Sequence, residues 1–158
     1  MRRKDREVAE KEELRGILDR CHVCRLGLYD GQEVYILPLK FGYSWQGELP
    51  ELFFHGAAKG RKFDIIAGNP RVAFEMDCSH RMITAETPCE WSMEFESIVG
   101  QGVLEVVEDP DLRRKGLDLL MEKAGYKGGQ DYDPRVMAAT AVLRLTVTRM
   151  SGKRLQKR

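Results

Sequence analysis

The fold is decided by the stretch VCRLGLYDGQEVYILPLKFGY, residues 23–43. Before the turn, its apolar residues alternate with polar or small ones, as on one face of a strand: Cys24, Leu26 and Leu28. Asp30-Gly31 is a typical two-residue hairpin turn, so a second strand is predicted at residues 33–43. Because proline donates no ladder hydrogen bond, Pro38 marks an edge, a bulge or a place where the sheet opens. The stretch therefore predicts an antiparallel hairpin, and an opened sheet has room for a flat ligand.

Further strands and helices are predicted on either side of this hairpin. The expected strands cover residues 52–55, 71–77, 93–107 and 141–148, and the expected helices cover residues 7–20, 58–68 and 109–123. Residues 78–91 are polar and irregular, which indicates a loop with some strand character, and a short turn is expected near residues 136–139. Six or seven strands with so few helices exclude a doubly wound fold. They predict a small antiparallel barrel flanked by helices.

Length and charge set further limits. The chain has 158 residues, which fits one domain, and its 26 basic and 25 acidic residues nearly cancel. No global field therefore favours nucleic acid or an anionic membrane, and any anion site must be local. The sequence has no apolar signal core, so a cytoplasmic location is expected. We expect one domain over residues 1–153, followed by a disordered basic tail at 154–158.

A basic turn follows the predicted strand at residues 52–55. The stretch FFHGAAKGRK, residues 53–62, ends in a helix that opens with Lys59, Arg61 and Lys62. Cations are disfavoured at a helix start, unless an anion lies among them. Gly56 and Gly60 would allow the backbone to approach a phosphate closely, and the free amides would bind its oxygens. On the turn alone, a phosphate site and a solvated basic turn remain equal alternatives.

The cysteines allow a second kind of site. Cys21 and Cys24 have the C-x-x-C spacing, and a mixed zinc or redox site could add Cys78, Cys89, His22 and His80. The second cysteine pair is eleven residues apart, which is not the spacing of a structural zinc site. We therefore expect ordinary, partly buried thiols and no metal site, with metal binding or thiol redox chemistry as the alternative.

Four segments together resemble one known group: CRLGL (24–28), YILPLKFGY (35–43), FHGAAKGRK (54–62) and SIVGQG (97–102). In this order they are similar to flavin split-barrel proteins. Within these, the sequence resembles the 5-nitroimidazole reductase (nitroimidazole resistance) branch of the pyridoxamine 5'-phosphate oxidase-like superfamily, over residues 1–153. The resemblance implies a mainly β fold with flanking helices, an antiparallel Greek-key split β-barrel that binds FMN.

The resemblance also assigns site residues. It places Pro38, Leu39 and Lys40 beside the isoalloxazine ring, and it places the ribityl phosphate at residues 55–62. Within this segment Lys59, Arg61 and Lys62 are the expected phosphate ligands, and His55, Gly56 and Gly60 are further cofactor-binding residues. It implies that Ser97, Val99 and Gly100 approach the flavin from a second subunit, so the protein would be a homodimer with the cofactor at the interface. Gly56 stands where relatives often have serine, which removes a hydroxyl contact to phosphate.

His55 is the candidate catalytic residue. By resemblance it borders the cofactor and substrate space, where an imidazole would donate a proton to a reduced substrate or hydrogen-bond the flavin. The alternative is a histidine at a strand end that caps the next turn. Aromatic residues could stack on a flat substrate or pack in the core or dimer: Phe41, Tyr43, Trp45 and Trp91.

The function implied is an FMN-dependent oxidoreductase. Reduced flavin would pass electrons to a flat small-molecule acceptor, of which a nitro-aromatic (nitroimidazole-like) compound is favoured. One alternative is a non-catalytic flavin-binding or electron-transfer module. Pyridoxamine 5'-phosphate oxidation is a weaker alternative, because it needs a second phosphate site and the sequence shows one basic cradle. No nucleic-acid or membrane partner is expected.

Overall fold

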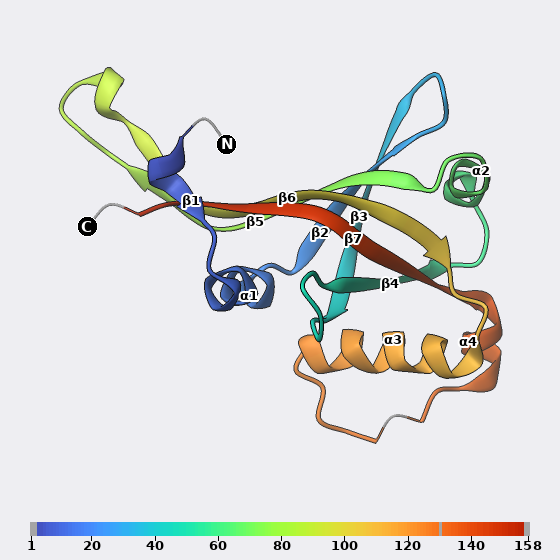
Figure 1. Ribbon diagram of the computed structural model, residues 1–158. Coiled ribbons are helices and arrows are strands. Elements are labelled where there is room, and N and C mark those ends of the chain that lie inside the picture. Colours follow the sequence, from blue (N-terminus) through green and yellow to red (C-terminus); the bar gives the residue numbers. More distant parts are fainter. Residues whose placement is uncertain (1–2, 130, 157–158) are drawn as a thin grey trace.

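The computed structural model describes residues 3–129 and 131–156, drawn in Figure 1. The described chain has seven strands: β1 (Glu7–Val8), β2 (Val23–Tyr29), β3 (Val34–Ser44), β4 (Glu51–Ala57), β5 (Arg71–Ile83), β6 (Ser92–Val106) and β7 (Thr140–Leu155). Its helices are α1 (Lys11–Arg20), α2 (Arg61–Gly68), α3 (Pro110–Lys123) and α4 (Pro134–Ala139), with short 3-10 turns η1 (Lys4–Arg6) and η2 (Pro88–Glu90). The predicted mainly β architecture with flanking helices is confirmed.

The strands form one antiparallel sheet that closes on itself. Its order is β1-β7-β4-β3-β2-β5-β6, and β6 also pairs with β7, which closes the barrel. Strand β3 changes neighbours along its length, because residues 34–40 pair with β2 and residues 41–44 pair with β4. Pro38 lies in the part that pairs with β2 alone, as the missing N–H group requires. The barrel is therefore split between β3 and β4, and the predicted split β-barrel is confirmed.

Helices α1, α2 and α3 pack against the barrel, and α2 contributes Ile65 and Ile66 to the main core. On α1, Leu14, Ile17 and Leu18 are buried in the main core. Below the barrel in Figure 1, α3 runs along β3 and β4, and its leucines join a second apolar cluster with Phe53. The backbone of Gly42 lies so close to α3 that an added Cβ would be 2.5 Å from the carbonyl carbon of Leu119. Close helix packing therefore requires glycine at this position.

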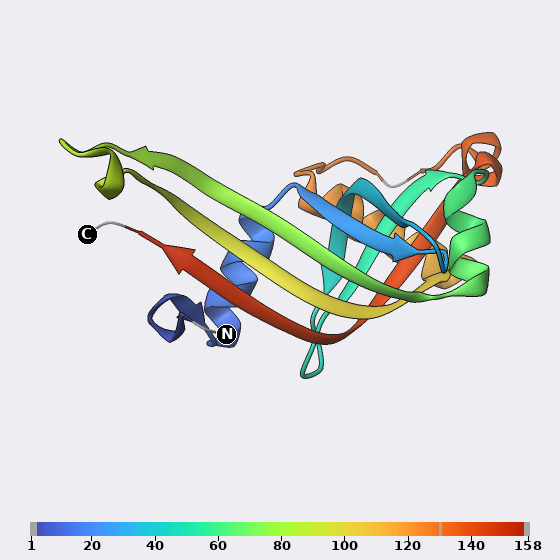
Figure 2. The same ribbon diagram turned by 90° about the horizontal axis from the view of Figure 1, so that it is seen from above.

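The segment predicted as a loop forms a long arm instead. Strand β5 continues to Ile83 and β6 starts at Ser92, with a register shift between Cys78 and Arg81. Ser79, at this bulge, has a positive φ of 60°. We call residues 79–95 the arm, which extends away from the barrel in Figures 1 and 2. Its sequence looks irregular because the bulge breaks the two-residue alternation.

The basic tail is also ordered further than predicted. Strand β7 runs to Leu155 and pairs with β6 at its end. Arg154 donates to Glu96 at 2.7 Å and to Glu13 at 2.8 Å, so its charge is bound within the fold. The expectation of disorder is therefore wrong for Arg154 and Leu155. Residues 157–158 lie outside the described residues.

Three boundaries differ from the prediction for local reasons. The first helix begins at Lys11, because Glu7 and Val8 pair with β7 as a short strand. The second begins at Arg61, because Gly60 has a φ of 125°. The hairpin turn spans residues 30–33, where the Asp30 carboxylate accepts hydrogen bonds from two backbone amides. None of the helices in the described chain is long and apolar enough to span a membrane.

Candidate functional site

The split between β3 and β4 forms the entrance to the candidate site. Phe41 and Phe54 are the last paired residues before the strands diverge, and Lys40 and His55 follow them on the two sides of this opening. Both side chains are exposed. Partial burial by neighbouring atoms lowers the pKa of His55, and the nearby positive charge of Lys40 lowers it further. The imidazole of His55 is therefore neutral at neutral pH, with one N–H donor and one acceptor nitrogen.

A basic turn, residues 57–62, connects β4 to α2 beside the opening. Within the described chain no side chain caps the start of α2 at Gly60, which leaves backbone N–H groups of the first turn for another partner. The Lys62 ammonium lies across this turn and donates to the carbonyls of Ala57 (2.9 Å) and Lys59 (3.1 Å). Burial lowers the pKa of Lys62. The turn thus joins a fixed cation to free amide donors, which is the donor set of an anion site.

Glycines keep this turn open. A Cβ added at Gly60 would lie 3.8 Å from the Lys62 nitrogen, and one at Gly56 would lie 4.0 Å from its Cε atom. Side chains at either position would fill the space beside the ammonium. Gly60 also needs its positive φ, which L side chains rarely adopt. The two glycines predicted to let a phosphate approach are therefore placed beside the cation that would bind it.

Arg61 is directed elsewhere. Its guanidinium contacts Asp30 at 2.7 Å and Glu33 at 3.1 Å, and it lies over the Tyr35 ring at 5.4 Å. These contacts tie the start of α2 to the β2–β3 turn. A phosphate would have to draw Arg61 away from two carboxylates, whereas Lys62 is already beside the helix start and the Lys59 side chain is exposed. Of the three predicted phosphate ligands, Lys59 and Lys62 are therefore better placed to bind a phosphate than Arg61.

The β3 residues divide between the two faces of the sheet. Pro38 and Lys40 are exposed on the outer face, while Leu39 is half-buried and packs against the main core. Only the backbone of Leu39 is therefore in reach of a ligand on the outer face. The backbone from Pro38 to Lys40 pairs with β2 on one side, and β4 does not extend along it on the other.

Ser97, Val99 and Gly100 lie apart from this group. They belong to β6, which is separated from β3 by β2 and β5 in the sheet. Three strand spacings amount to about 14 Å. Within one chain, the structure therefore brings together Lys40, His55 and the basic turn, and it leaves the β6 residues at a distance.

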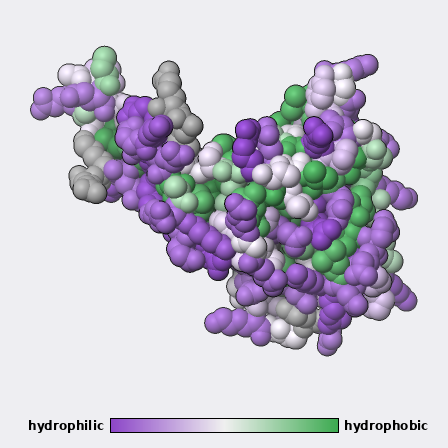
Figure 3. Space-filling view, in the orientation of Figure 1, coloured by the Kyte–Doolittle hydropathy of each residue, from purple (hydrophilic) through white to green (hydrophobic). Residues whose placement is uncertain are grey.

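The outer face between these two groups is concave and partly apolar. A hollow of about 710 Å³ lies over β2, β5, β6 and β7, and a second of about 740 Å³ continues it. Both are lined by Gly27, Ile36, Ala73 and Gln101. We call this concave face the saddle. Figure 3 shows apolar surface in it, between the arm and the β2–β3 hairpin.

Sequence reasoning missed Arg25, which lies in the saddle. Its guanidinium contacts Asp77 at 2.6 Å and Glu75 at 3.0 Å, and Arg25 lines the hollow of about 710 Å³ together with Val99. The signal was present in the sequence, because Arg25 is an outward position between the inward residues Cys24 and Leu26. Its acidic partners, Glu75 and Asp77, lie about fifty residues later in the chain, so the sequence alone does not identify them.

The four cysteines are free thiols at different depths in the fold: Cys21 and Cys24 are buried, Cys78 is half-buried and Cys89 is exposed. Cys21 and Cys24 are buried free thiols, and burial raises the pKa of both. Among the described residues, no group of three or more His, Cys, Asp and Glu side chains is placed to hold a metal ion. A buried thiol with a raised pKa has little of the thiolate that redox chemistry requires.

The fold and the site define a class of protein. A closed antiparallel barrel that splits between two strands is a split barrel, and here an uncapped helix start with a lysine beside it lies at the opening. A family model described as Pyridoxamine 5'-phosphate oxidase matches residues 10–154, and the chain belongs to this family. No curated protein matches the sequence.

Solved structures of similar fold include flavin proteins. The chain is similar to a proposed 5-nitroimidazole antibiotic resistance protein from Bacteroides thetaiotaomicron, with 25% identity, a TM-score of 0.79, and coverage of 93% of this chain and 85% of that chain. The flavocytochrome Anf3 from Azotobacter vinelandii has 17% identity and a TM-score of 0.79, with 99% and 72% covered. An FAD and heme binding protein from Mycobacterium smegmatis has 21% identity and a TM-score of 0.78, with 96% and 74% covered. The latter two show likeness of fold alone.

Proposed function

We propose that this protein is an FMN-dependent oxidoreductase that passes electrons to a flat small-molecule acceptor, with nitro-aromatic compounds as the favoured class. The observation that carries the proposal is the basic turn, where the Lys62 ammonium lies beside an uncapped helix start next to the split in the barrel. Membership of the pyridoxamine 5'-phosphate oxidase family supports a flavin. The similar protein from Bacteroides thetaiotaomicron supports the nitro-aromatic class.

The residues present fit FMN in two places. The first-turn amides of α2, Lys62 and Lys59 would hold the phosphate, because they combine N–H donors with positive charge. The outer backbone of residues 38–40 would lie beside the ring system. Bound FMN would supply single-electron transfer and also hydride transfer, which no amino-acid side chain performs. The protein would supply position and electrostatics.

His55 acts in this proposal mainly as a neutral hydrogen-bonding group. Its lowered pKa leaves little imidazolium at neutral pH, so its protonated form is a scarce acid there. A neutral N–H group beside the opening can still orient the cofactor or an acceptor. Proton donation by His55 would strengthen as the pH falls through its pKa. The candidate catalytic role thus predicts a rate that rises toward acid pH.

We propose further that the protein is a homodimer with the flavin at the subunit interface. By resemblance, Ser97, Val99 and Gly100 would approach the cofactor of the second subunit; in their own chain they lie on β6, three strands from β3. Val99 and Ile36 are exposed apolar residues in the saddle, which fits a face that a protein covers.

The first test is flavin binding. The purified protein should show a flavin-type visible spectrum, or acquire one on adding FMN, and chromatography of the released cofactor would distinguish FMN from FAD. Lys62→Met should weaken FMN binding by about 10- to 100-fold, since a charge-assisted hydrogen bond contributes about 1.5–3 kcal/mol. The matched control is Lys127→Met, on an exposed loop away from the opening. Protein that binds neither flavin, or Lys62→Met with unchanged affinity, would refute this site.

The second test separates an enzyme from a flavin-binding module. Protein reduced with dithionite under anaerobic conditions would be mixed with a nitroimidazole, and reoxidation followed by absorbance. An enzyme should reoxidise at a rate that saturates with acceptor concentration and should form reduced product. A rate no faster than that of free reduced FMN would favour the non-catalytic module.

A further inference from the structure

The arm exposes large apolar side chains that its own chain does not cover. Met82 and Met93 form a cross-strand pair on its two strands and are 59% and 42% exposed. Trp91, at the end of η2, is 51% exposed. Exposed residues of this size that lie together mark an interaction surface.

The apolar surface of the arm continues into the saddle. Along β6, Glu94, Glu96 and Ile98 point inward, so Met93 lies on the same outer face as Val99 and Val103. All three outward residues are exposed. The arm and the saddle therefore form one continuous face, and a single partner can cover both.

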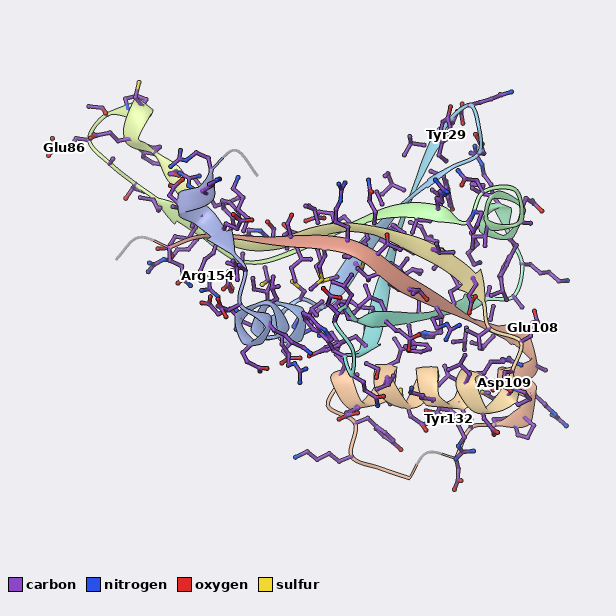
Figure 4. The ribbon with its side chains drawn as sticks, viewed as in Figure 1. Tyr29, Glu86, Glu108, Asp109, Tyr132 and Arg154 are labelled. Carbon is purple, nitrogen blue, oxygen red and sulfur yellow. The ribbon has the colours of Figure 1, made fainter. Side chains whose placement is uncertain are left out.

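The two ends of this face carry opposite charge. The arm tip, residues 84–91, contains Glu86 and Glu90 and no lysine or arginine. At the other end lies the basic turn, where Arg61 is paired with Asp30 and Glu33 of the neighbouring hairpin, and Lys59 and Lys62 supply the remaining positive charge. In Figure 4, Glu86 stands at the arm tip, far from Tyr29 at the end of the β2–β3 hairpin. The face is therefore complementary to a second copy of itself that is turned end for end.

We propose that each arm crosses to the second copy of the chain and covers the opening between that copy's β3 and β4. Trp91, Met82 and Met93 then form the apolar wall of the partner's substrate space, and the acidic tip approaches the partner's Lys59. This proposal rests on the homodimer of the proposed function and names what the second copy contributes to the site. In the alternative orientation the two arms would lie against each other. Glu86 and Glu90 of one subunit would then face the same residues of the second subunit, and the like charges would repel.

Hydrogen bonds to Glu96 at the base of the arm fix the direction of the arm relative to the barrel. The Glu96 carboxylate is 2% exposed and accepts from Arg20 at 2.8 and 2.9 Å, from Arg154 at 2.7 Å and from Ser79 at 2.8 Å. Arg20 belongs to α1 and Arg154 to β7, so two other elements are tied to the point where the arm leaves the barrel (Figure 4). An arm that is already fixed loses little entropy when it binds a partner.

Cross-linking in mixed dimers tests the arrangement. Unlabelled and ¹⁵N-labelled protein would be mixed, allowed to exchange and treated with a carbodiimide, which joins carboxylates to lysine amines. We expect peptides that join Glu86 or Glu90 of one isotope to Lys59 or Lys40 of the other. Links only within one chain, a dimer with no arm link to either lysine, or a monomeric protein would overturn the proposal.

Variants on the arm provide a second measurement. Met82→Glu with Met93→Glu should raise the dimer dissociation constant by about tenfold or more, measured by sedimentation equilibrium. Val136→Glu, an exposed apolar residue on α4, is the matched control and should leave it unchanged. Equal effects of the arm variant and the control would contradict the proposal. Neither experiment requires flavin, so crossed arms in a protein that binds no flavin would refute the proposed function alone.

Discussion

Replacing Glu96 by glutamine should destabilise the protein by about 2–3 kcal/mol. The substitution keeps the size of the side chain but removes a charge that receives hydrogen bonds from two guanidinium groups and a hydroxyl. Breaking a fully buried pair costs about 3–5 kcal/mol, because a charge is left without its partner. Here Arg20 is about half exposed and Arg154 about a quarter exposed, so water can solvate them and the cost is lower.

Urea and thermal unfolding would measure this loss. For a chain of this size, 2–3 kcal/mol corresponds to a fall in Tm of about 4–12 °C. The control is Glu105→Gln on the same strand, whose own side chain is 47% exposed and whose partner Arg144 lies 2.6 Å away. An exposed pair contributes about 0–1 kcal/mol. Equal losses for the two variants, or a loss below about 0.5 kcal/mol at Glu96, would refute the reasoning.

The difference between wild type and Glu96→Gln should also depend on pH. Burial by itself would raise the pKa of Glu96, but hydrogen bonds from Arg20, Ser79 and Arg154 outweigh it, and the net pKa is lowered. A carboxylate with a lowered folded-state pKa contributes stability that is present above its unfolded pKa and is lost as the pH falls through its folded pKa. The stability gap should therefore be full at neutral pH and shrink in acid. A gap that is constant down to acid pH would contradict the assigned ionisation.

Three further predictions concern single positions. Gly100→Ala should lower the stability by about 1–3 kcal/mol in urea unfolding, because the added Cβ would lie 2.5 Å from the Phe74 ring, while Gly47→Ala, with nothing within 4 Å, should cost far less. Gly60→Ala should weaken FMN binding in a fluorescence titration, since the turn needs a φ of 125°, and unchanged affinity would show that the turn does not bind the phosphate. His55→Gln should remove the acid-side rise in reductase rate expected below about pH 6.5, the ordinary pKa of histidine, and a variant that keeps this pH profile would exclude proton donation by His55.

Local rules predicted the barrel because each rule needed only neighbouring residues. The alternation around Leu26, the turn at Asp30 and the proline at position 38 fix a hairpin and its open edge without distant information. The arm was missed for the opposite reason. The bulge at Ser79 shifts the register, and the inward position on the β6 side of the arm is a buried glutamate, Glu94, in place of an apolar residue, so the hydrophobic alternation is lost.

The candidate site was predicted in part for similar reasons. Lys59, Arg61 and Lys62 are adjacent in sequence, which suggested one cradle. Arg61 instead contacts Asp30 and Glu33, which lie about thirty residues earlier in the chain. A charge pattern shows where cations are, but only the fold shows which carboxylates already hold them.

The predicted site residues form two separate groups in one chain, so their contributions to flavin binding can be tested separately. Lys40, His55 and Lys62 surround the opening, whereas Val99 lies about three strand spacings, roughly 14 Å, away on the same outer face. In the proposed dimer, the two groups that act on one flavin come from different chains. Substitutions at Lys62 and at Val99 should then complement each other, because a mixed dimer of the two variants contains one site with both residues intact. Dimers that recover none of the flavin binding on mixing would mean that each chain builds its site alone.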